Sequence, residues 1–325
     1  MREMKEKFNE LIRESESICI LGHISPDGDC AGSTLGVYNY IKSMCESCGT
    51  VKRIRVYLEE LADKFSYLCG YDEICHEPDE NESYELAIVC DCGDFARMGK
   101  FMRYAKEAKK IFCADHHITN TGFGDHHVIM PDASSTCEVV YDLFNKELIN
   151  KEIAECIYTG LVHDTGVFRY SCTSKHTMEI AGECMEKGID FGSIIDDGFF
   201  AMTYTQKQIL ARALMESRLS EDGRIISTYI PASAMKLYGV GKKDMDGIID
   251  ELRTTKGIVC AVFMYQMITG QYKVSLRSNT DKLDVSKVAS HFGGGGHVRA
   301  AGCSLPGNPE DIIKKLTEQI RLQIG

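Results

Sequence analysis

The sequence lacks the features that mark membrane-spanning or secreted proteins. No apolar run reaches 18 residues, which excludes a membrane-spanning helix. The first ten residues alternate in charge and have no apolar core, so we expect no secretory signal and no membrane partner. Low-complexity sequence is confined to four consecutive glycines at 293–296, and no internal repeat is present.

An excess of positive charge is also missing. The chain has 37 Lys and Arg residues against 48 Asp and Glu residues, a net charge of -11. A broad basic surface for long nucleic acid is therefore not expected, and we predict no binding of long DNA. An anionic substrate would need a local site, helped by metal ions.

The cysteines do not form the pattern of a disulfide framework. There are 15, an odd number, and they are scattered through apolar runs such as Ile18-Cys19-Ile20. This distribution is typical of buried free thiols in a reducing compartment, so we expect a cytoplasmic protein.

The apolar pattern of the first half predicts an α/β fold. Apolar runs at 17–22, 53–58, 85–90 and 110–114 are separated or followed by helical patterns at 31–46, 62–69, 100–108, 135–148, 151–163 and 175–187. Strands without polar alternation that are separated by helices predict a mostly parallel sheet with helices on both faces.

The pattern changes after about residue 190, as expected of a second domain in a chain of 325 residues. We predict a catalytic domain over 1–190, a linker and helix over 191–210, and a smaller α/β domain over 211–325, with a cleft between the domains. In the second domain we expect strands at 224–230, 257–267 and 271–277, and a final strand and helix after the glycines.

The strongest chemical signal follows the first predicted strand. One imidazole and two carboxylates fall within seven residues of the segment Gly22-His23-Ile24-Ser25-Pro26-Asp27-Gly28-Asp29. Ligands of open α/β sheets bind at the carboxyl ends of the strands. Mixed oxygen and nitrogen donors suit Mn²⁺, Zn²⁺ or Fe²⁺ better than Ca²⁺, although aspartates that cap a helix would give a similar pattern.

Three further segments strengthen the metal interpretation. Asp91 follows the third strand, Asp115-His116-His117 follows the fourth, and Asp164 ends a helix. Helix caps alone do not explain four such sites at one edge of a sheet. Together they supply ligands for two cations, an arrangement that is common in phosphoryl transfer to water.

With these motifs, the sequence resembles the DHH phosphoesterase superfamily. The matching elements are His23-x3-Asp27-x-Asp29, Asp91, Asp115-His116-His117 and Asp164, and the segment from His291 to Gly302 resembles the DHH-associated domain. Chain length and the Gly-Gly-Gly-His element are similar to the nanoRNase and pAp phosphatase group.

The resemblance implies a role for each motif residue. His23 and Asp27 would hold one metal ion, Asp29, His116 and Asp164 the other, and Asp91 would bridge both. His117 would contact the scissile phosphate and protonate the leaving group. The family implies two divalent cations, by habit Mn²⁺.

The same resemblance points to residues that would hold the rest of the substrate. Arg97 would lie near the metals, although an exposed surface charge explains it equally well. In the second domain, the substrate-binding residues would be Arg277, Gly294, Gly295, Gly296, His297 and Arg299. Successive glycine N–H groups can bind an anion, and a flexible connector is the alternative.

Several similar patterns are interpreted as structural. The second Asp-His-His, Asp125-His126-His127, opens a strand instead of ending one, and His163 is expected to pack in the core. We expect Cys90 and Cys92 to be core residues and the Cys45-x-x-Cys48 pair to be free thiols, since only one such pair is present.

The sequence therefore predicts a metal-dependent hydrolase of short RNA or adenosine 3′,5′-bisphosphate (pAp). Hydrolysis of pApA or cyclic di-AMP is an alternative, and so is a nucleotide-binding regulator without catalysis. The acidic composition disfavours an exonuclease on long strands, and the glycine element disfavours a family II pyrophosphatase. Relatives are often homodimers, but no residue of this chain indicates one.

Overall fold

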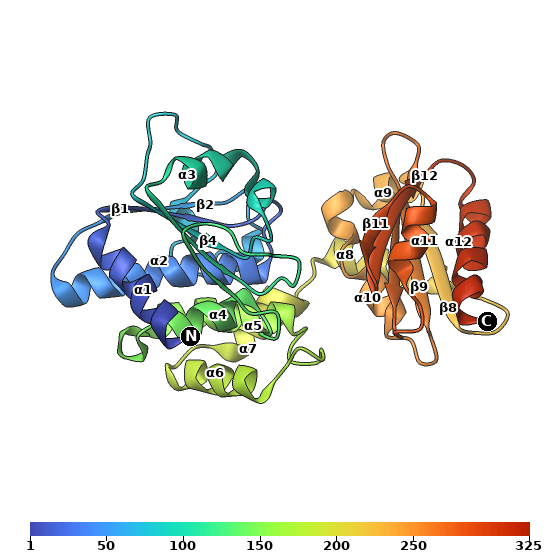
Figure 1. Ribbon diagram of the computed structural model, residues 1–325. Helices are drawn as coiled ribbons and strands as arrows, with labels where there is room; N and C mark the ends of the chain where they lie inside the picture. The colour runs from blue at the N-terminus through green and yellow to red at the C-terminus, as the bar shows by residue number, and fades with distance from the viewer. The chain divides into compact units, whose positions relative to one another are not determined.

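The structure is a computed structural model that describes residues 1–325. The chain forms two compact units, Met1–Ala201 and Met202–Gly325. Each has its own β-sheet and helices (Figure 1). The chain is thus an α/β protein with a larger first unit and a smaller second unit, as predicted.

The first unit is built on a six-stranded sheet in the order β3-β2-β1-β4-β5-β6, and every neighbouring pair is parallel. The strands are β1 (Ser17–Leu21), β2 (Arg53–Tyr57), β3 (Ile74–Cys75), β4 (Leu86–Cys90), β5 (Lys110–Asp115) and β6 (His126–Ile129). The helices are α1 (Arg2–Glu14), α2 (Gly28–Cys48), α3 (Met102–Glu107), α4 (Thr136–Leu143), α5 (Lys151–Asp164), α6 (Lys175–Glu186) and α7 (Phe191–Ile195).

Both faces of the sheet are buried at its central strands β1 and β4, which explains their unbroken apolar sequences. Along β1, Ile18 and Ile20 belong to the core beneath α1, α2, α4 and α5. Cys19 and Leu21 point the other way, into a second core that contains residues of α3. Because successive side chains of a strand alternate between faces, a strand covered on both sides must be apolar throughout.

The second unit has a mixed sheet in the order β11-β12-β10-β9-β8-β7, in which only β8 and β9 pair in parallel. The strands are β7 (Arg218–Leu219), β8 (Ile225–Ile230), β9 (Cys260–Gln266), β10 (Tyr272–Ser278), β11 (Gly295–His297) and β12 (Ala300–Leu305). The helices are α8 (Tyr204–Met215), α9 (Ala232–Tyr238), α10 (Ile248–Arg253), α11 (Val285–His291) and α12 (Pro309–Ile324). One core contains residues of α11 and α12, and another contains residues of α8, α9 and α10.

Short helical turns complete the chain. The 3-10 turns are η1 (Asp63–Phe65), η2 (Tyr71–Glu73), η3 (Phe95–Phe101), η4 (Lys146–Leu148) and η6 (Lys242–Met245), and η5 (Asp196–Phe200) is a π-helical turn. The segment expected as a linker, 191–210, contains α7 and η5, which contact α5 of the first unit, and the beginning of α8, which contacts β8 of the second.

Two predicted helices differ from the structure. The expected helix at 62–69 is only the turn η1, because Leu61, Phe65 and Leu68 are buried without a longer helix and Gly70 turns the chain at a φ of 92°. The expected helix at 135–148 ends at Leu143, since Phe144 is extended and η4 follows. The helix α1 was not predicted, although its buried Phe8, Leu11 and Ile12 have helical spacing.

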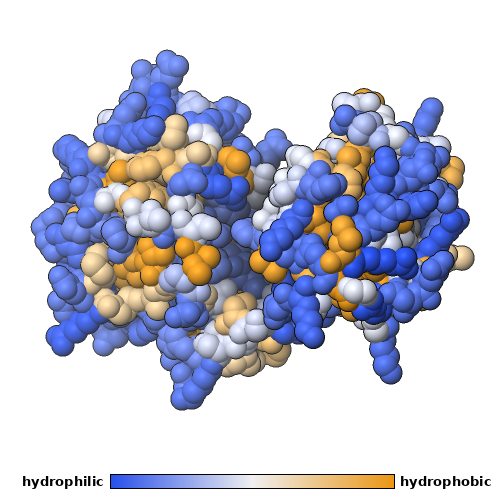
Figure 2. Space-filling model, turned by 45° about the vertical axis from the view of Figure 1, so that its right-hand side comes forward, coloured by the Kyte–Doolittle hydropathy of each residue, from blue (hydrophilic) through white to orange (hydrophobic).

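The helices are too short or too polar to cross a bilayer. On the face shown in Figure 2, hydrophilic residues predominate and hydrophobic residues form small separate patches.

Candidate metal centre

The candidate site lies at the carboxyl edge of the parallel sheet of the first unit. Three adjacent strands, β1, β4 and β5, end there, and their next residues include His23, Asp91 and His116. The first turn of α2 adds Asp29, and α5 ends on Asp164. The order of strands in the sheet thus brings together side chains that lie more than 140 residues apart in sequence.

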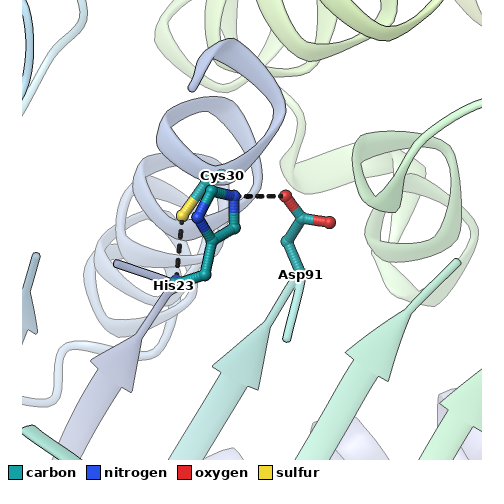
Figure 3. Close-up of side chains that lie close together, drawn as sticks. All are labelled: His23, Cys30 and Asp91. Atoms are coloured by element: carbon teal, nitrogen blue, oxygen red, sulfur yellow. Dashed lines mark hydrogen bonds and ion pairs between the residues drawn. The ribbon is translucent and has the colours of Figure 1, made fainter. Parts of the chain in front are cut away.

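Asp91 lies at the centre of these side chains. Its Oδ2 is 3.3 Å from Nε2 of His23 (Figure 3), and its Oδ1 is 3.7 Å from Nε2 of His116 and 3.5 Å from Nδ1 of His117. The two carboxylate oxygens therefore face different histidines. Asp91 has a φ of 59°, a left-handed conformation that costs a non-glycine residue about 1–3 kcal/mol and is found mainly at functional sites.

The imidazole of His23 is oriented by its own backbone. Its Nδ1 is 2.8 Å from the carbonyl oxygen of Ile24, so Nδ1 donates and Nε2 is left to face Asp91 and, at 3.8 Å, Asp27. Burial opposes the charged ring, but these carboxylates outweigh it and raise the pKa of His23. The thiol of Cys30 also lies beside His23 and accepts its backbone N–H.

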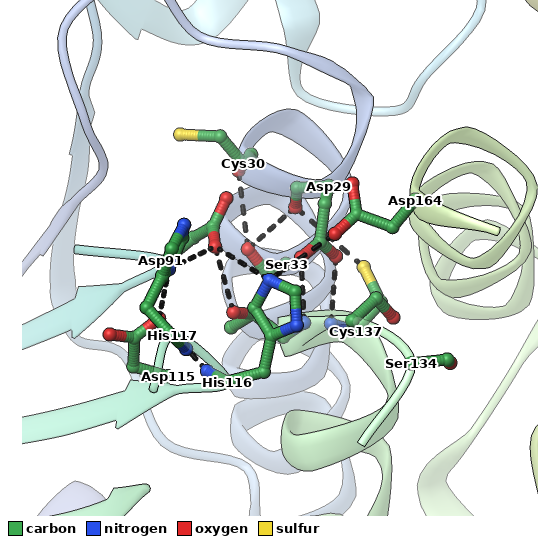
Figure 4. A network of polar contacts seen from close by, with 12 residues as sticks. Asp29, Cys30, Ser33, Asp91, Asp115, His116, His117, Ser134, Cys137 and Asp164 are labelled. Atoms are coloured by element: carbon green, nitrogen blue, oxygen red, sulfur yellow. Dashed lines mark hydrogen bonds and ion pairs between the residues drawn. The ribbon is translucent and has the colours of Figure 1, made fainter. Parts of the chain in front are cut away.

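A second group of ligand atoms is centred on His116. Its Nε2 is 3.2 Å from Oδ2 of Asp164 and 3.9 Å from Oδ2 of Asp29 (Figure 4). Burial and the neighbouring carboxylates raise the pKa of Asp29 and of Asp164. Closely spaced carboxylates repel one another, and a divalent cation would relieve that repulsion.

These donor sets fit divalent cations. His23 with Asp91, and His116 with Asp29 and Asp164, place imidazole nitrogens and carboxylate oxygens within 4.8 Å of one another. The ion-pair partners of the three carboxylates are histidines and not the fixed cations of Lys or Arg. Five of the six residues predicted as ligands belong to these groups, and the sixth, Asp27, is 3.8 Å from His23.

Asp27 has a second function in the fold. Its Oδ1 accepts the backbone N–H groups of Asp29 and Cys30 and so caps α2. Asp27 can cap α2 and also bind a metal ion, since both functions need its carboxylate at the first turn of this helix. Gly28 allows the close approach of α5, because a Cβ there would lie 2.1 Å from Cγ of His163.

His117 differs from the other histidines in its partner. Its Nδ1 is 2.7 Å from Oδ1 of Asp115, and it is 42% exposed, against 5% for His23. The hydrogen bond to Asp115 raises the pKa of His117, although burial opposes it. With Nδ1 bonded to Asp115, Nε2 remains for a substrate atom. The side chain of His117 also lies with Asp91 and His116 in a group of donor atoms that could hold a cation.

The residues that orient the side chains of the site were assigned no role from the sequence. Asp115 accepts hydrogen bonds from His117 and from Asn120, the latter at 2.7 Å. At the start of α4, the N–H of Thr136 donates to Asp29 at 2.6 Å and its Oγ1 donates to Asp91 at 3.0 Å. The N–H of Cys137 donates to the other oxygen of Asp29 at 2.9 Å.

The residues interpreted as structural behave as expected. Oδ2 of Asp125 accepts the N–H of Ile111, and His126 and His127 open β6. His163 packs between Phe65 and Phe199, and burial lowers its pKa to about 4. Cys90 and Cys92 are buried in the core, and all 15 cysteines are free.

Arg97 lies near the site through its backbone. Its carbonyl oxygen accepts the N–H of Ile24 at 2.7 Å, directly after His23. Its side chain is exposed.

The predicted substrate residues of the second unit gather around the turn between β11 and β12. His297 and Arg277 both stand opposite Ala300 in the strand register, and the carbonyl oxygen of Arg299 accepts the N–H of Ser278. The guanidinium groups of Arg277 and Arg299 face Asp250 at 3.8 Å and Asp281 at 2.7 Å, respectively.

Gly295 and Gly296 of the glycine run belong to β11, and Gly294 packs closely against β12, so the run is not a flexible connector. A Cβ on Gly294 would lie 2.2 Å from the carbonyl oxygen of Gly302, and Gly296 has a φ of 147°. Gly295, in contrast, is exposed and has no atom within 4 Å of such a Cβ. Packing thus accounts for two of these glycines and leaves Gly295 without a structural reason.

Comparison with known proteins agrees with both units. The DHH family, N-terminal domain, matches residues 17–161, and the DHHA1 domain matches residues 227–322. The chain thus consists of a DHH domain followed by a DHHA1 domain. Members of the DHH family are metal-dependent phosphoesterases, which agrees with the donor groups at the sheet edge.

Two DHH relatives match almost the whole chain. The bifunctional oligoribonuclease and PAP phosphatase NrnA of Thermus thermophilus is 27% identical over 310 residues, which cover 94% of this chain and 90% of the relative. The protein of the same name from Bacillus subtilis is also 27% identical over 310 residues, with 93% of each chain covered.

A solved structure shares the fold. It is an exopolyphosphatase-related protein from Bacteroides fragilis, with a TM-score of 0.90 and 24% identity, and the match covers 100% of this chain and 98% of that one.

Proposed function

We propose that this protein is a two-cation phosphoesterase that hydrolyses short oligoribonucleotides and pAp. The observation that carries the proposal is the position of Asp91, whose two oxygens face His23 on one side and His116 on the other. The names of the full-length DHH relatives, oligoribonuclease and PAP phosphatase, give the substrate class.

Six side chains would hold the cations. His23, Asp27 and Asp91 would bind one, and Asp29, Asp91, His116 and Asp164 would bind the other. Two Mn²⁺ ions held there would supply Lewis acidity to the attacking water and to the scissile phosphate. Hydrogen bonds from the start of α4 support this assignment. Thr136 and Cys137 fix the orientation of Asp29, and Thr136 also fixes that of Asp91.

His117 would act as the general acid. Asp115 binds Nδ1 and stabilises the imidazolium form, so Nε2 can give a proton to the departing oxygen of the nucleotide. Its partial exposure allows a substrate to reach it. Arg97, whose backbone borders the metal-binding loop, would add a positive charge for the phosphate.

The second unit would hold the rest of the nucleotide. The exposed surface at Gly295 and the side chains of His297, Arg277 and Arg299 are the proposed contacts. The charges of the two units support this division. Residues 202–325 contain 17 Lys and Arg against 12 Asp and Glu, a net +5, whereas residues 1–201 contain 20 against 36, a net -16.

The test is a comparison of substrates at one Mn²⁺ concentration. The panel contains pAp, pApA, RNAs of two to five nucleotides, a long RNA, cyclic di-AMP and pyrophosphate. We expect turnover of pAp and the shortest RNAs, and little of the long RNA. Faster turnover of cyclic di-AMP or pyrophosphate than of every short RNA and pAp would refute the proposed substrate class.

A further inference from the structure

The second unit contains a groove at the sheet edge opposite the glycine strand. It has a volume of ≈ 1060 Å³ and lies between the end of α8, the strands β7 and β8, and α12. In the strand order, β11 with its glycines is at one edge and β7 is at the other. Five strand spacings of about 4.8 Å separate these edges, so the groove is not part of the proposed substrate site.

Two buried polar atoms of this groove have no partner. Thr228 is only 2% exposed, and its Oγ1 makes no hydrogen bond. The Nε of Arg212 is also buried and unbonded, although Nη2 of the same side chain pairs with Glu216 at 3.0 Å. Buried polar groups are nearly always bonded, and leaving one unbonded is unfavourable. Two such atoms in one groove indicate a ligand that would bond to them.

Four cations and three carboxylates line the groove, and of those on α12 the unpaired charges are positive. The carboxylates are Glu216, Glu221 and Glu310. Arg218 is paired with Glu310 at 3.2 Å, but Lys314 and Arg321 on α12 have no carboxylate within 4.0 Å. They lie seven residues apart, which places them on the same face of the helix. The unit that carries them has a net charge of +5.

The groove also has apolar walls. Met215, which ends α8, and Leu219, which ends β7, are 87% and 58% exposed, and the half-buried Tyr229 also lines the groove. Exposed apolar side chains next to unpaired cations suit a ligand that has both a planar ring and a phosphate.

We propose that this groove is a second binding site for a nucleoside phosphate, separate from the proposed hydrolytic site. The base lies against Met215, Leu219 and Tyr229, and the phosphate is bound by Lys314 and Arg321. Oγ1 of Thr228 and Nε of Arg212 hydrogen-bond to the ligand. The site does not depend on the proposed hydrolysis.

Equilibrium dialysis of AMP against the full chain tests the site. The comparison is between the wild type, the double variant Lys314→Ala/Arg321→Ala and Lys315→Ala, whose lysine is exposed on α12 but outside the groove. We expect the double variant to bind one AMP fewer per chain than the wild type, and Lys315→Ala to bind the same number. Equal AMP binding by all three proteins would overturn the proposal, whether or not the protein hydrolyses pAp.

Thr228→Val tests the unbonded hydroxyl. Because this change removes an unsatisfied polar atom at nearly constant shape, the melting temperature should stay the same or rise. The affinity of the groove for AMP should fall about fivefold, as for a lost hydrogen bond. Unchanged affinity would contradict the role of Thr228. Binding of inorganic phosphate and of adenosine is measured in the same way. If phosphate binds as tightly as AMP, the apolar side chains do not contribute to binding of the base.

Discussion

At the scale of single residues, the candidate metal centre depends on side chains that orient the ligands as much as on the ligands. Thr136 contacts two of them, with its N–H on Asp29 and its hydroxyl on Asp91. Residues that orient metal ligands tune metal affinity, and their loss typically costs 10- to 100-fold, on the order of 1–3 kcal/mol.

Replacing Thr136 with valine should weaken Mn²⁺ binding about 10-fold, because Asp91 loses the hydroxyl that fixes one of its oxygens. Thr136→Ser keeps that hydroxyl and should bind Mn²⁺ like the wild type. Calorimetric titration of both variants with Mn²⁺ measures this without an activity assay. If valine and serine variants bind equally well, the hydroxyl does not orient Asp91.

His117→Ala should separate proton transfer from metal binding. Loss of a general acid typically lowers the rate by about 10²–10⁴-fold, while Mn²⁺ binding should be unchanged, since His117 is not a proposed ligand. Because the pKa of His117 is raised, its acid form persists above the usual range of histidine and activity should fall only at more alkaline pH. The variant should lack this alkaline limb.

A substrate whose leaving group needs no proton provides the control for His117. A p-nitrophenyl phosphoester should be hydrolysed by His117→Ala with a much smaller defect than pAp. Equal defects on both esters would argue against a general acid.

The residues show which parts of the site could be predicted from sequence. His23, Asp91 and His116 follow apolar runs, and the ends of parallel strands meet at one edge, so their proximity was predictable. The contact of Thr136 with Asp91 was not, because it spans 45 residues and depends on where α4 begins. Asn120 was missed for a different reason, since a polar loop residue gives no periodic signal.

At the scale of secondary-structure elements, the glycines at the start of β11 differ in the space around them: Gly294, just before the strand, is closely packed, and Gly295 is open. Gly294→Ala should destabilise the second unit, because its Cβ would collide with the backbone of β12. Overpacking of this kind costs about 1–3 kcal/mol. Gly295→Ala, which has open space, should leave stability unchanged and raise the KM for pAp.

Thermal unfolding and KM measured side by side test this glycine pair. Destabilisation by both changes would mean that packing also fixes Gly295. If Gly295→Ala changes neither the melting temperature nor the KM for pAp, this position does not approach the substrate.

The packing of α5 against η5 predicts a pH-dependent stability. His163 bonds to the carbonyl oxygen of Gly198 and has a pKa of about 4, below the ordinary value of 6.5. The unfolded chain then binds more protons than the folded chain between these values, so stability falls as pH falls through this window. At pH 5 the loss relative to pH 7.5 is about 2 kcal/mol.

Urea unfolding at pH 7.5 and pH 5 measures this effect. His163→Gln should show a smaller loss between the two pH values than the wild type, because the glutamine does not titrate. An identical loss in both proteins would assign the acid sensitivity to other groups.

The elements also show why part of the fold was not foreseen. Four strands of the parallel sheet, β1, β2, β4 and β5, were predicted within one or two residues. The helix expected at 62–69 was wrong because helical spacing of Leu61, Phe65 and Leu68 is compatible with a short turn that buries the same side chains. The edge strands β3 and β7 have two residues each, too few for a recognisable period.

At the scale of the whole molecule, opposite charges divide the chain. The net charge of -11 is the sum of a net charge of -16 on the first unit and +5 on the second. Cations bound by the first unit would reduce its repulsion for a phosphate, and the second unit attracts anions without them. The sequence-wide charge therefore excluded a broad nucleic-acid surface, but a short anionic substrate needs only local positive charge.

The most direct measurement is the rate of pAp hydrolysis as Mn²⁺ is added to metal-free protein, with bound metal counted in the same samples. We expect the rate to reach its plateau at two Mn²⁺ per chain. We also expect that Asp91→Asn, which weakens the bridging carboxylate, loses both the second equivalent of Mn²⁺ and at least about 10³-fold in rate. A full rate at one Mn²⁺ per chain, or no hydrolysis with two bound, would contradict the two-cation phosphoesterase.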